Sequence, residues 1–189
     1  MSRNAPAPII VVSDTGPLLS AFQCSRIDLL RRYFKQVYIP APVIEEFKQH
    51  NAGDNLRELI EDGLIVVEHL TVAEAEKAEQ IAGRIAASPL SRERDYHHHL
   101  PEAEAMVLAQ REALGVSRIL LEERAARQVA RQMGIPLTGF IGVLLMACDE
   151  QLLTPTEMRA LLEMCRQQGT RYSNDLVDEV CQLCEELRT

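Results

Sequence analysis

The fold of this chain is indicated near its N-terminus by the stretch Ile9-Ile10-Val11-Val12-Ser13-Asp14-Thr15-Gly16-Pro17. Four β-branched residues in a row are typical of a strand that is covered on both faces, as in parallel sheets. The Asp, Thr, Gly and Pro that follow favour a turn into a helix. Ligands of parallel α/β sheets gather outside the carboxyl ends of strands, where Asp14 lies. Asp14 is therefore either a turn residue or the first member of a site.

The rest of the chain alternates strand-like and helix-like segments. Short apolar runs predict further strands at residues 37–39, 64–67, 118–121 and 135–137. Helical patterns cover residues 18–34, 42–52, 54–61, 72–86, 101–114, 122–133 and 140–148. Two amphipathic helices follow, and the first begins with the capping box Thr154-Pro155-Thr156-Glu157. This alternation predicts right-handed crossovers around a central parallel sheet, which gives a three-layer α/β/α fold with a C-terminal helical extension.

The length and the composition favour a single domain. The chain has 189 residues, of which 47% are hydrophobic, enough for one sizeable core. We expect a flexible N-terminus at residues 1–8, an α/β domain at 9–150, and C-terminal helices at 151–189 that pack on the same domain.

Charge and cysteine content narrow the classes of function. Lysine and arginine number 20 against 28 acidic residues, so the formal charge of -8 repels polyanions as a whole. Any nucleic-acid contact must be local or assisted by a metal ion.

The five cysteines are odd in number and lie mostly in apolar helical contexts, which predicts reduced thiols and a cytoplasmic location. Neither a signal peptide nor an apolar run of about 20 residues is found, so we expect no membrane association.

Acidic residues recur where the predicted strands end and helices begin. They are Asp14, Glu45, Glu46, Glu102, Glu104, Glu122 and Glu123. With right-handed crossovers these positions converge on one sheet edge and form an oxygen-only site suited to Mg²⁺ or Mn²⁺. Each glutamate taken singly has a structural alternative, because acids in a first helical turn are favoured by the helix dipole. Glu102 and Glu104 lie about 200° apart around a helix, so only one of them is expected to face an ion.

Several blocks of the chain resemble the PIN-domain nucleases, particularly a largely uncharacterised prokaryotic branch. The first two blocks are residues 11–19 and Ile39-Pro40-Ala41-Pro42-Val43-Ile44-Glu45-Glu46-Phe47. The later blocks are residues 102–109, 119–127 and 138–145. The resemblance covers roughly residues 9–180, and its strength lies in the order of the blocks.

The resemblance implies a set of metal ligands. Asp14 would be the first acid, Glu46 the second and Glu104 the third, and Glu123 would be the fourth, with Glu122 as its alternative. Thr15, Glu102 and Glu122 are the candidate supporting residues. The Thr15 hydroxyl either hydrogen-bonds a ligand carboxylate or a water, or satisfies the backbone of its turn, and Glu102 is then a favourable charge at a helix N-terminus. The ion implied is Mg²⁺ or Mn²⁺, which neutralises phosphate charge and lowers the pKa of an attacking water.

The chain departs from the family pattern in two places. Glutamates stand in the fourth block where the branch typically has aspartates, and the extra methylene alters the reach of the carboxylate. Pro101 replaces the usual glycine before the third acid, and the loop before it carries His97-His98-His99. Adjacent imidazoles on a loop diverge, so we interpret this segment as a surface loop and not as a metal site. Cys181 and Cys184 have zinc-like spacing without a second pair, and core packing is the better interpretation.

The resemblance implies a metal-dependent ribonuclease acting on single-stranded RNA. Family members often serve as toxins paired with a small antitoxin protein, and they commonly form homodimers. Arg124, Arg127 and Arg131 share a helix face that either contacts the nucleic-acid backbone or is a solvated basic face.

Two rival functions share features of this sequence. A catalytically degenerate PIN-like module would bind RNA or a protein partner, and would keep the fold without binding metal. An aspartic protease also carries Asp-Thr-Gly after apolar residues, but such enzymes consist almost wholly of strands, whereas this sequence is mostly helical.

Overall fold

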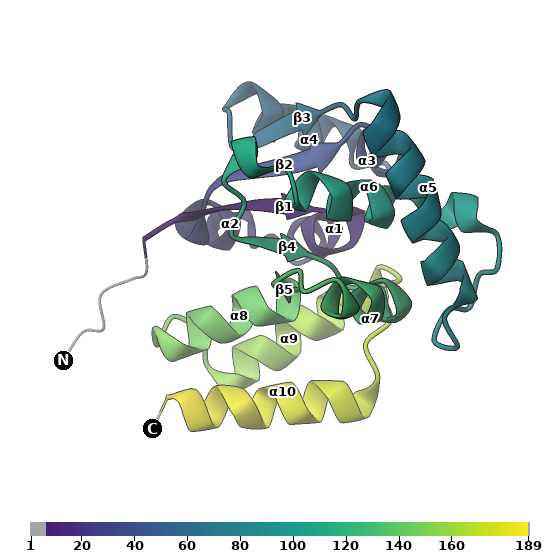
Figure 1. Cartoon of the computed structure of the whole chain (residues 1–189). Coiled ribbons are helices and arrows are strands. Elements are labelled where there is room, and N and C mark those ends of the chain that lie inside the picture. Colours follow the sequence, from purple (N-terminus) through teal and green to yellow (C-terminus); the bar gives the residue numbers. More distant parts are fainter. Residues whose placement is uncertain (1–6, 189) are drawn as a thin grey trace.

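A five-stranded sheet forms the centre of the computed structural model, which describes residues 7–188 (Figure 1). Its strands are β1 (Ile9–Ser13), β2 (Phe34–Pro40), β3 (Ile65–Glu68), β4 (Arg118–Leu120) and β5 (Leu137–Thr138). They lie in the order β3-β2-β1-β4-β5, and every neighbouring pair is parallel. The predicted parallel sheet is thus confirmed. The first six residues of the predicted flexible N-terminus, 1–8, lie outside the described residues.

Helices cover both faces of this sheet, as the three-layer prediction requires. One layer holds α1 (Thr15–Gln23), α2 (Ile27–Tyr33), α3 (Pro42–Gln49), α4 (Gly53–Glu61), α8 (Phe140–Asp149), α9 (Pro155–Gln167) and α10 (Asn174–Leu187). The opposite layer holds α5 (Val72–Ala87), α6 (Leu100–Ala109) and α7 (Arg124–Gln132). Two 3-10 helices, η1 (Tyr96–His99) and η2 (Glu112–Leu114), flank α6. No described helix is long and apolar enough to cross a membrane.

The two cores follow from the alternation of side chains along the strands. Val11 and Leu120 face the larger core, whereas Val12 and Ile119 face the smaller core under α5, α6 and α7. The larger core continues into the C-terminal helices, where α8, α9 and α10 lie one beneath another in Figure 1. The predicted capping box at Thr154 is present at the start of α9. The C-terminal extension therefore shares its core with the sheet.

One long helix predicted at residues 18–34 is in fact two helices. The chain leaves the helical conformation after Gln23, and Ser25 adopts a left-handed backbone with φ of 56°. The chain becomes helical again after Arg26, whose guanidinium pairs with Asp28 in the first turn of α2 (Nε to Oδ1, 2.9 Å). The apolar periodicity continues through this break because both helices pack on the same core, so periodicity alone does not detect it.

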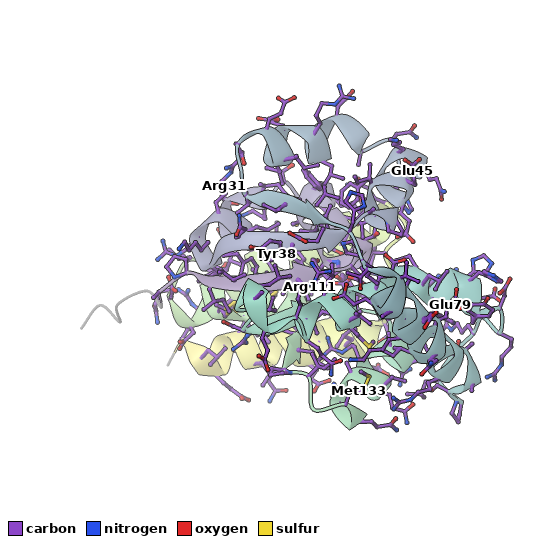
Figure 2. The ribbon with its side chains drawn as sticks, turned by 45° about the horizontal axis from the view of Figure 1, so that its top comes forward. Arg31, Tyr38, Glu45, Glu79, Arg111 and Met133 are labelled. Atoms are coloured by element: carbon purple, nitrogen blue, oxygen red, sulfur yellow. A yellow bond between two sulfur atoms is a disulfide. The ribbon has the colours of Figure 1, made fainter. Side chains whose placement is uncertain are left out.

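Arg111, labelled in Figure 2, ties the smaller layer to the edge of the sheet. Its guanidinium donates to Glu68 at the end of β3 (2.7 Å) and to Glu74 in the first turn of α5 (2.8 Å). The hydrogen bond from Arg111, together with those from Thr71, lowers the pKa of Glu74 to about 2. The ion pairs hold the segment after α6 against β3, on the path that leads the chain back into β4.

The prediction of reduced thiols is wrong for two of the five cysteines. Cys148 at the end of α8 and Cys184 in α10 form a disulfide, with Cα atoms 5.4 Å apart. The other three, Cys24, Cys165 and Cys181, are free and buried. Cys181 and Cys184 both lie in the apolar core, as predicted, although Cys184 also forms a covalent bond there. An apolar helical context does not separate a thiol from a disulfide, because the bond depends on which helices pack together.

Candidate metal centre

The candidate site lies at the point where the direction of sheet building reverses. The connections from β1 to β2 to β3 run through the layer of α1 to α4, and those from β3 to β4 to β5 run through the layer of α5 to α7. The reversal falls between the neighbouring strands β1 and β4. Crevices outside the carboxyl ends of strands at such a point are the usual ligand sites of open α/β sheets. Asp14 follows β1 directly, and Glu122 and Glu123 follow β4.

Asp14 is 5% exposed, and its backbone N–H bonds to Leu120 O across the strand pair (3.3 Å). Its Oδ1 is buried and has no hydrogen-bond partner among the described residues. Burial raises the pKa of Asp14 well above its ordinary range, and Glu102 is the neighbouring acid that adds most to this effect. Glu122, Glu46 and Glu123 also raise the pKa of Asp14, so these acids surround it.

Glu102, in the first turn of α6, is the second acid with an unsatisfied oxygen. Its Oε2 is buried without a hydrogen-bond partner in the described part of the chain. Burial, together with the charges of Glu46 and Glu123, raises the pKa of Glu102 to about 8. Asp14 and Glu102 therefore present buried carboxylate oxygens that no group within residues 7–188 satisfies.

The acids predicted on α3 separate into one that faces the site and one that faces solvent. Thr15 Oγ1 donates a hydrogen bond to Glu46 Oε2, which joins Glu46 to the turn that follows β1. Glu45, labelled near the rim of the molecule in Figure 2, points outward and bonds Lys48 Nζ (2.6 Å). Thr15 thus contacts an acid of the site, as the sequence suggested for a supporting residue.

Glu122 is held between hydroxyl groups and two glycines. Tyr172 Oη donates to Glu122 Oε1 (2.9 Å), and Ser20 Oγ donates to Glu122 Oε2 (3.3 Å). A Cβ on Gly16 would lie 3.3 Å from Glu122 Oε2, and one on Gly139 would lie 3.5 Å from Glu122 Cγ. Burial raises the pKa of Glu122, and the Tyr172 hydrogen bond is the largest effect that lowers it.

Glu104 and Glu123 occupy different surroundings from the four acids above. Glu104 is half-buried, and burial alone raises its pKa, without a contribution from any other acid. Glu123 is the N-cap of α7, and its Oε2 accepts from Ala126 N (2.5 Å). Glu123 still adds to the negative charge around Asp14 and Glu102. Glu46, Glu102, Glu122 and Glu123 all add negative charge to the surroundings of Asp14, and Glu104 is not among the acids that do so.

The three arginines of α7 differ in their exposure to solvent. Arg127 is half-buried, and its Nη1 donates to Leu121 O (2.6 Å). Burial lowers the pKa of Arg127, while the charges of Glu122 and Asp14 work against this shift. Arg124 and Arg131 are exposed. Arg127 is thus a cation beside the acids, whereas the other two lie on the outer surface of the helix.

The donor set suits a hard divalent cation. Within residues 7–188, no three His, Cys, Asp or Glu side chains are already grouped closely enough to hold a metal ion. Carboxylates with like charge repel one another, and a cation removes that repulsion. The unsatisfied oxygens of Asp14 and Glu102, and the all-oxygen chemistry of the cluster, fit Mg²⁺ or Mn²⁺.

A family model described as PIN domain matches residues 10–186, which is nearly the whole chain. This chain belongs to the PIN domain family. PIN domains are generally nucleases and typically depend on divalent metal ions, so an acidic cluster at this sheet edge is where the family's chemistry is expected. Neither a curated protein nor a solved structure matches the sequence.

Two residues that donate hydrogen bonds to the acidic cluster of this PIN domain, Ser20 and Tyr172, were not predicted from the sequence. Ser20 looks like an ordinary polar residue within α1, although it is completely buried. Tyr172 lies in a polar segment between α9 and α10, about 50 positions after Glu122 in the sequence. The one sequence feature that sets Tyr172 apart is its aromatic ring within a polar segment, and this feature does not predict which residue it contacts.

The histidine loop is only partly on the surface of this PIN domain. His97 and His98 are exposed, but His99 is 4% exposed, and its Nε2 lies 3.0 Å from Ser91 Oγ and 3.1 Å from Glu93 O. The interpretation as a surface loop is therefore wrong for His99. Its ring closes the loop onto its own start, which is a structural role.

Proposed function

We propose that this PIN domain is a divalent-metal-dependent ribonuclease that cuts single-stranded RNA. The observation that supports it most is the pair of buried, unpartnered carboxylate oxygens of Asp14 and Glu102 at the switch point of the sheet. Buried polar groups in folded proteins ordinarily have hydrogen-bond partners, because burial without a partner destabilises the fold. A ligand that is itself positively charged accounts for the arrangement.

In this proposal Asp14, Glu46, Glu102 and Glu122 hold the ion, and Glu102 takes the place that the family resemblance gave to Glu104. When bound, a divalent cation neutralises phosphate charge and activates water as the nucleophile. Thr15 orients Glu46 through its hydrogen bond. Glu123 caps α7 and contributes negative charge without ligating.

Arg127 is the group that we assign to the phosphate of the substrate. One guanidinium nitrogen is anchored on Leu121 O, and the remaining donors of the planar fork suit phosphate oxygens. Arg124 and Arg131 would contact the RNA backbone further from the cleaved bond. Because the chain carries a charge of -8, these local cations and the bound metal must offset its repulsion of RNA.

The proposal is tested by Mn²⁺-dependent cleavage of labelled single-stranded RNA and DNA. The Asp14→Asn variant should lower the cleavage rate by about two orders of magnitude or more, because it removes a ligand charge at the centre of the cluster. Glu45→Gln is the matched control, since it removes a charge from an exposed glutamate that points away from the site and should leave the rate unchanged. Cleavage that survives both Asp14→Asn and a chelator would contradict the proposal, and equal cleavage of DNA would contradict the RNA preference.

A catalytically degenerate module that binds RNA or a protein partner is the second candidate. The observation in its favour is that Glu123 is engaged as a helix cap and Glu122 by two hydroxyl groups, so both acids after β4 already have protein partners. A folded wild-type protein that binds RNA equally well with and without Mn²⁺, and does not cleave it, would support this candidate.

The remaining proposals rest on the resemblance. They are a role as the toxin of a toxin-antitoxin pair, a small antitoxin protein as partner, and a homodimer. The proposed cytoplasmic location rests instead on the cysteine content. The disulfide between Cys148 and Cys184 weakens the cysteine argument for a reducing compartment.

A further inference from the structure

The start of the segment between α9 and α10 is attached to α1 by hydrogen bonds to one residue, Gln23. Gln168 Nε2 donates to Gln23 O (2.6 Å), and Gln23 Nε2 donates to Gln168 O (3.3 Å). Thr170 Oγ1 donates to Gln23 Oε1 (2.6 Å). Because Gln23 uses its amide and its backbone carbonyl on this segment, the path of residues 168–172 along the end of α1 is well defined.

This attachment sets Tyr172 beside Ser20, which lies one turn before Gln23 on the same face of α1. The Tyr172 hydroxyl lies 3.2 Å from Ser20 Oγ and donates to Glu122 Oε1 at 2.9 Å. Ser20 Oγ donates to the other oxygen, Glu122 Oε2, at 3.3 Å. Each oxygen of Glu122 therefore has its own hydroxyl donor, and one donor comes from the C-terminal extension.

These contacts restrict Glu122 on several sides. The backbone of Gly16 and Gly139 lies against the Glu122 side chain, since a Cβ on Gly16 would make a tight contact with its carboxylate and a Cβ on Gly139 would touch its Cγ. The backbone N–H of Phe140 is a third hydrogen-bond donor to Glu122. A carboxylate has about four lone-pair directions, so the two hydroxyl groups and this N–H orient the group and still leave one direction for another ligand. Hydrogen bonds of this kind to ligating carboxylates are a general means of orienting them toward a metal ion.

We propose that Tyr172 is a positioning residue, whose hydroxyl orients the Glu122 carboxylate toward the divalent cation, so that the C-terminal helices complete the metal site of the sheet. The role rests on the proposed function of the acidic cluster. It makes α9 and α10 part of the functional centre and not only a cover for the apolar core.

The first test is a calorimetric titration of MnCl₂ into the metal-free full chain. Tyr172→Phe keeps the buried ring and removes only the hydroxyl, and Mn²⁺ should bind about tenfold more weakly. Tyr33→Phe is the matched control, because Tyr33 is a buried tyrosine of α2 outside the acidic cluster. It should bind Mn²⁺ as the wild type does. Wild-type affinity in Tyr172→Phe would overturn the positioning role.

A double-mutant cycle separates positioning from a general structural effect. If Tyr172 acts through Glu122, then Tyr172→Phe should cause no further loss of Mn²⁺ affinity in a Glu122→Gln background. The same loss in both backgrounds would overturn the proposal, because it would show that the hydroxyl acts on something else. Gln23→Ala serves as a second route if Tyr172→Phe does not fold. It loosens the segment while keeping the tyrosine, and it too should weaken Mn²⁺ binding only when Glu122 is present.

The failure of this role and the failure of the proposed function give different results. Loss of Mn²⁺ binding in Asp14→Asn together with wild-type binding in Tyr172→Phe would overturn only the role of Tyr172. A folded wild type that binds no Mn²⁺ would overturn the proposed function and, with it, the positioning role.

Discussion

Glu102 and Glu104 are two positions apart in the sequence, and their surroundings differ in kind. Spacing on a helix indicates that only one of them faces an ion, and resemblance points to Glu104. In the structure Glu102 has a buried, unsatisfied oxygen, and the charges of other acids add to burial in raising its pKa. Burial is the one effect that raises the pKa of Glu104. The choice depends on how α6 is rotated against β1, β2 and β4, and this rotation is set by the packing of its apolar residues.

The raised pKa of Glu102 predicts a pH dependence of stability for the metal-free protein. Its pKa is about 8 in the folded chain against an ordinary value of 4.5. Between these values the unfolded chain has released a proton that the folded chain retains, so stability falls as pH rises, and the loss is complete above about pH 8. Thermal unfolding between pH 5 and pH 8 should show this decline, and Glu102→Gln should flatten it and stabilise the protein at pH 8 by about 1 to 3 kcal/mol.

Glu104→Gln is the matched control for that prediction. It should change the pH profile less and leave Mn²⁺ affinity unaltered, while Glu102→Gln should weaken Mn²⁺ binding. The reverse pattern of Mn²⁺ affinities would restore Glu104 as the third ligand.

At the scale of elements, the two acids after β4 accept hydrogen bonds from different parts of the molecule. The backbone turns sharply from β4 into α7, so Glu122 points toward α1 and the C-terminal segment, and Glu123 points back onto its own helix. A pair of adjacent glutamates in a sequence does not disclose this division. The division follows from the first turn of α7, which leaves backbone N–H groups that Glu123 caps.

The capping role of Glu123 leads to a test at the same scale. Glu123→Ala should lower the free energy of unfolding by about 1 kcal/mol, whereas Glu123→Ser, which supplies another capping oxygen, should restore most of it. Both variants should bind Mn²⁺ only slightly more weakly than the wild type, as measured by calorimetry, because they remove a nearby charge but no ligand. A large loss of affinity in Glu123→Ser would identify Glu123 as a ligand.

At the scale of the whole molecule, the disulfide joins the helix that follows β5 to the last helix of the chain. Cys148 and Cys184 are 36 positions apart, and the bond restricts the unfolded chain between them. The segment that it closes includes α9 and Tyr172. The covalent link therefore secures the same unit that contributes a hydroxyl to the acidic cluster.

Removal of this bond should cost stability. Cys184→Ser should lower the free energy of unfolding by about 2 to 4 kcal/mol under non-reducing conditions. Cys181→Ser, at a free thiol in the same helix, is the control and should differ from the wild type by less. Reductant should remove the difference between wild type and Cys184→Ser, and an unfolding midpoint of the wild type that is insensitive to reductant would contradict a stabilising disulfide.

The sequence by itself determined the layers, the parallel sheet and the edge at which the acids gather. These features depend on periodicities of two and 3.6 residues and on the handedness of crossovers, all of which are local or general. Only the tertiary structure decided that the charge of Glu102 and not that of Glu104 acts on Asp14, that Cys148 meets Cys184, and that Tyr172 reaches Glu122. Such contacts join positions far apart in the chain, and they depend on the rotation and packing of whole helices, which no local pattern records.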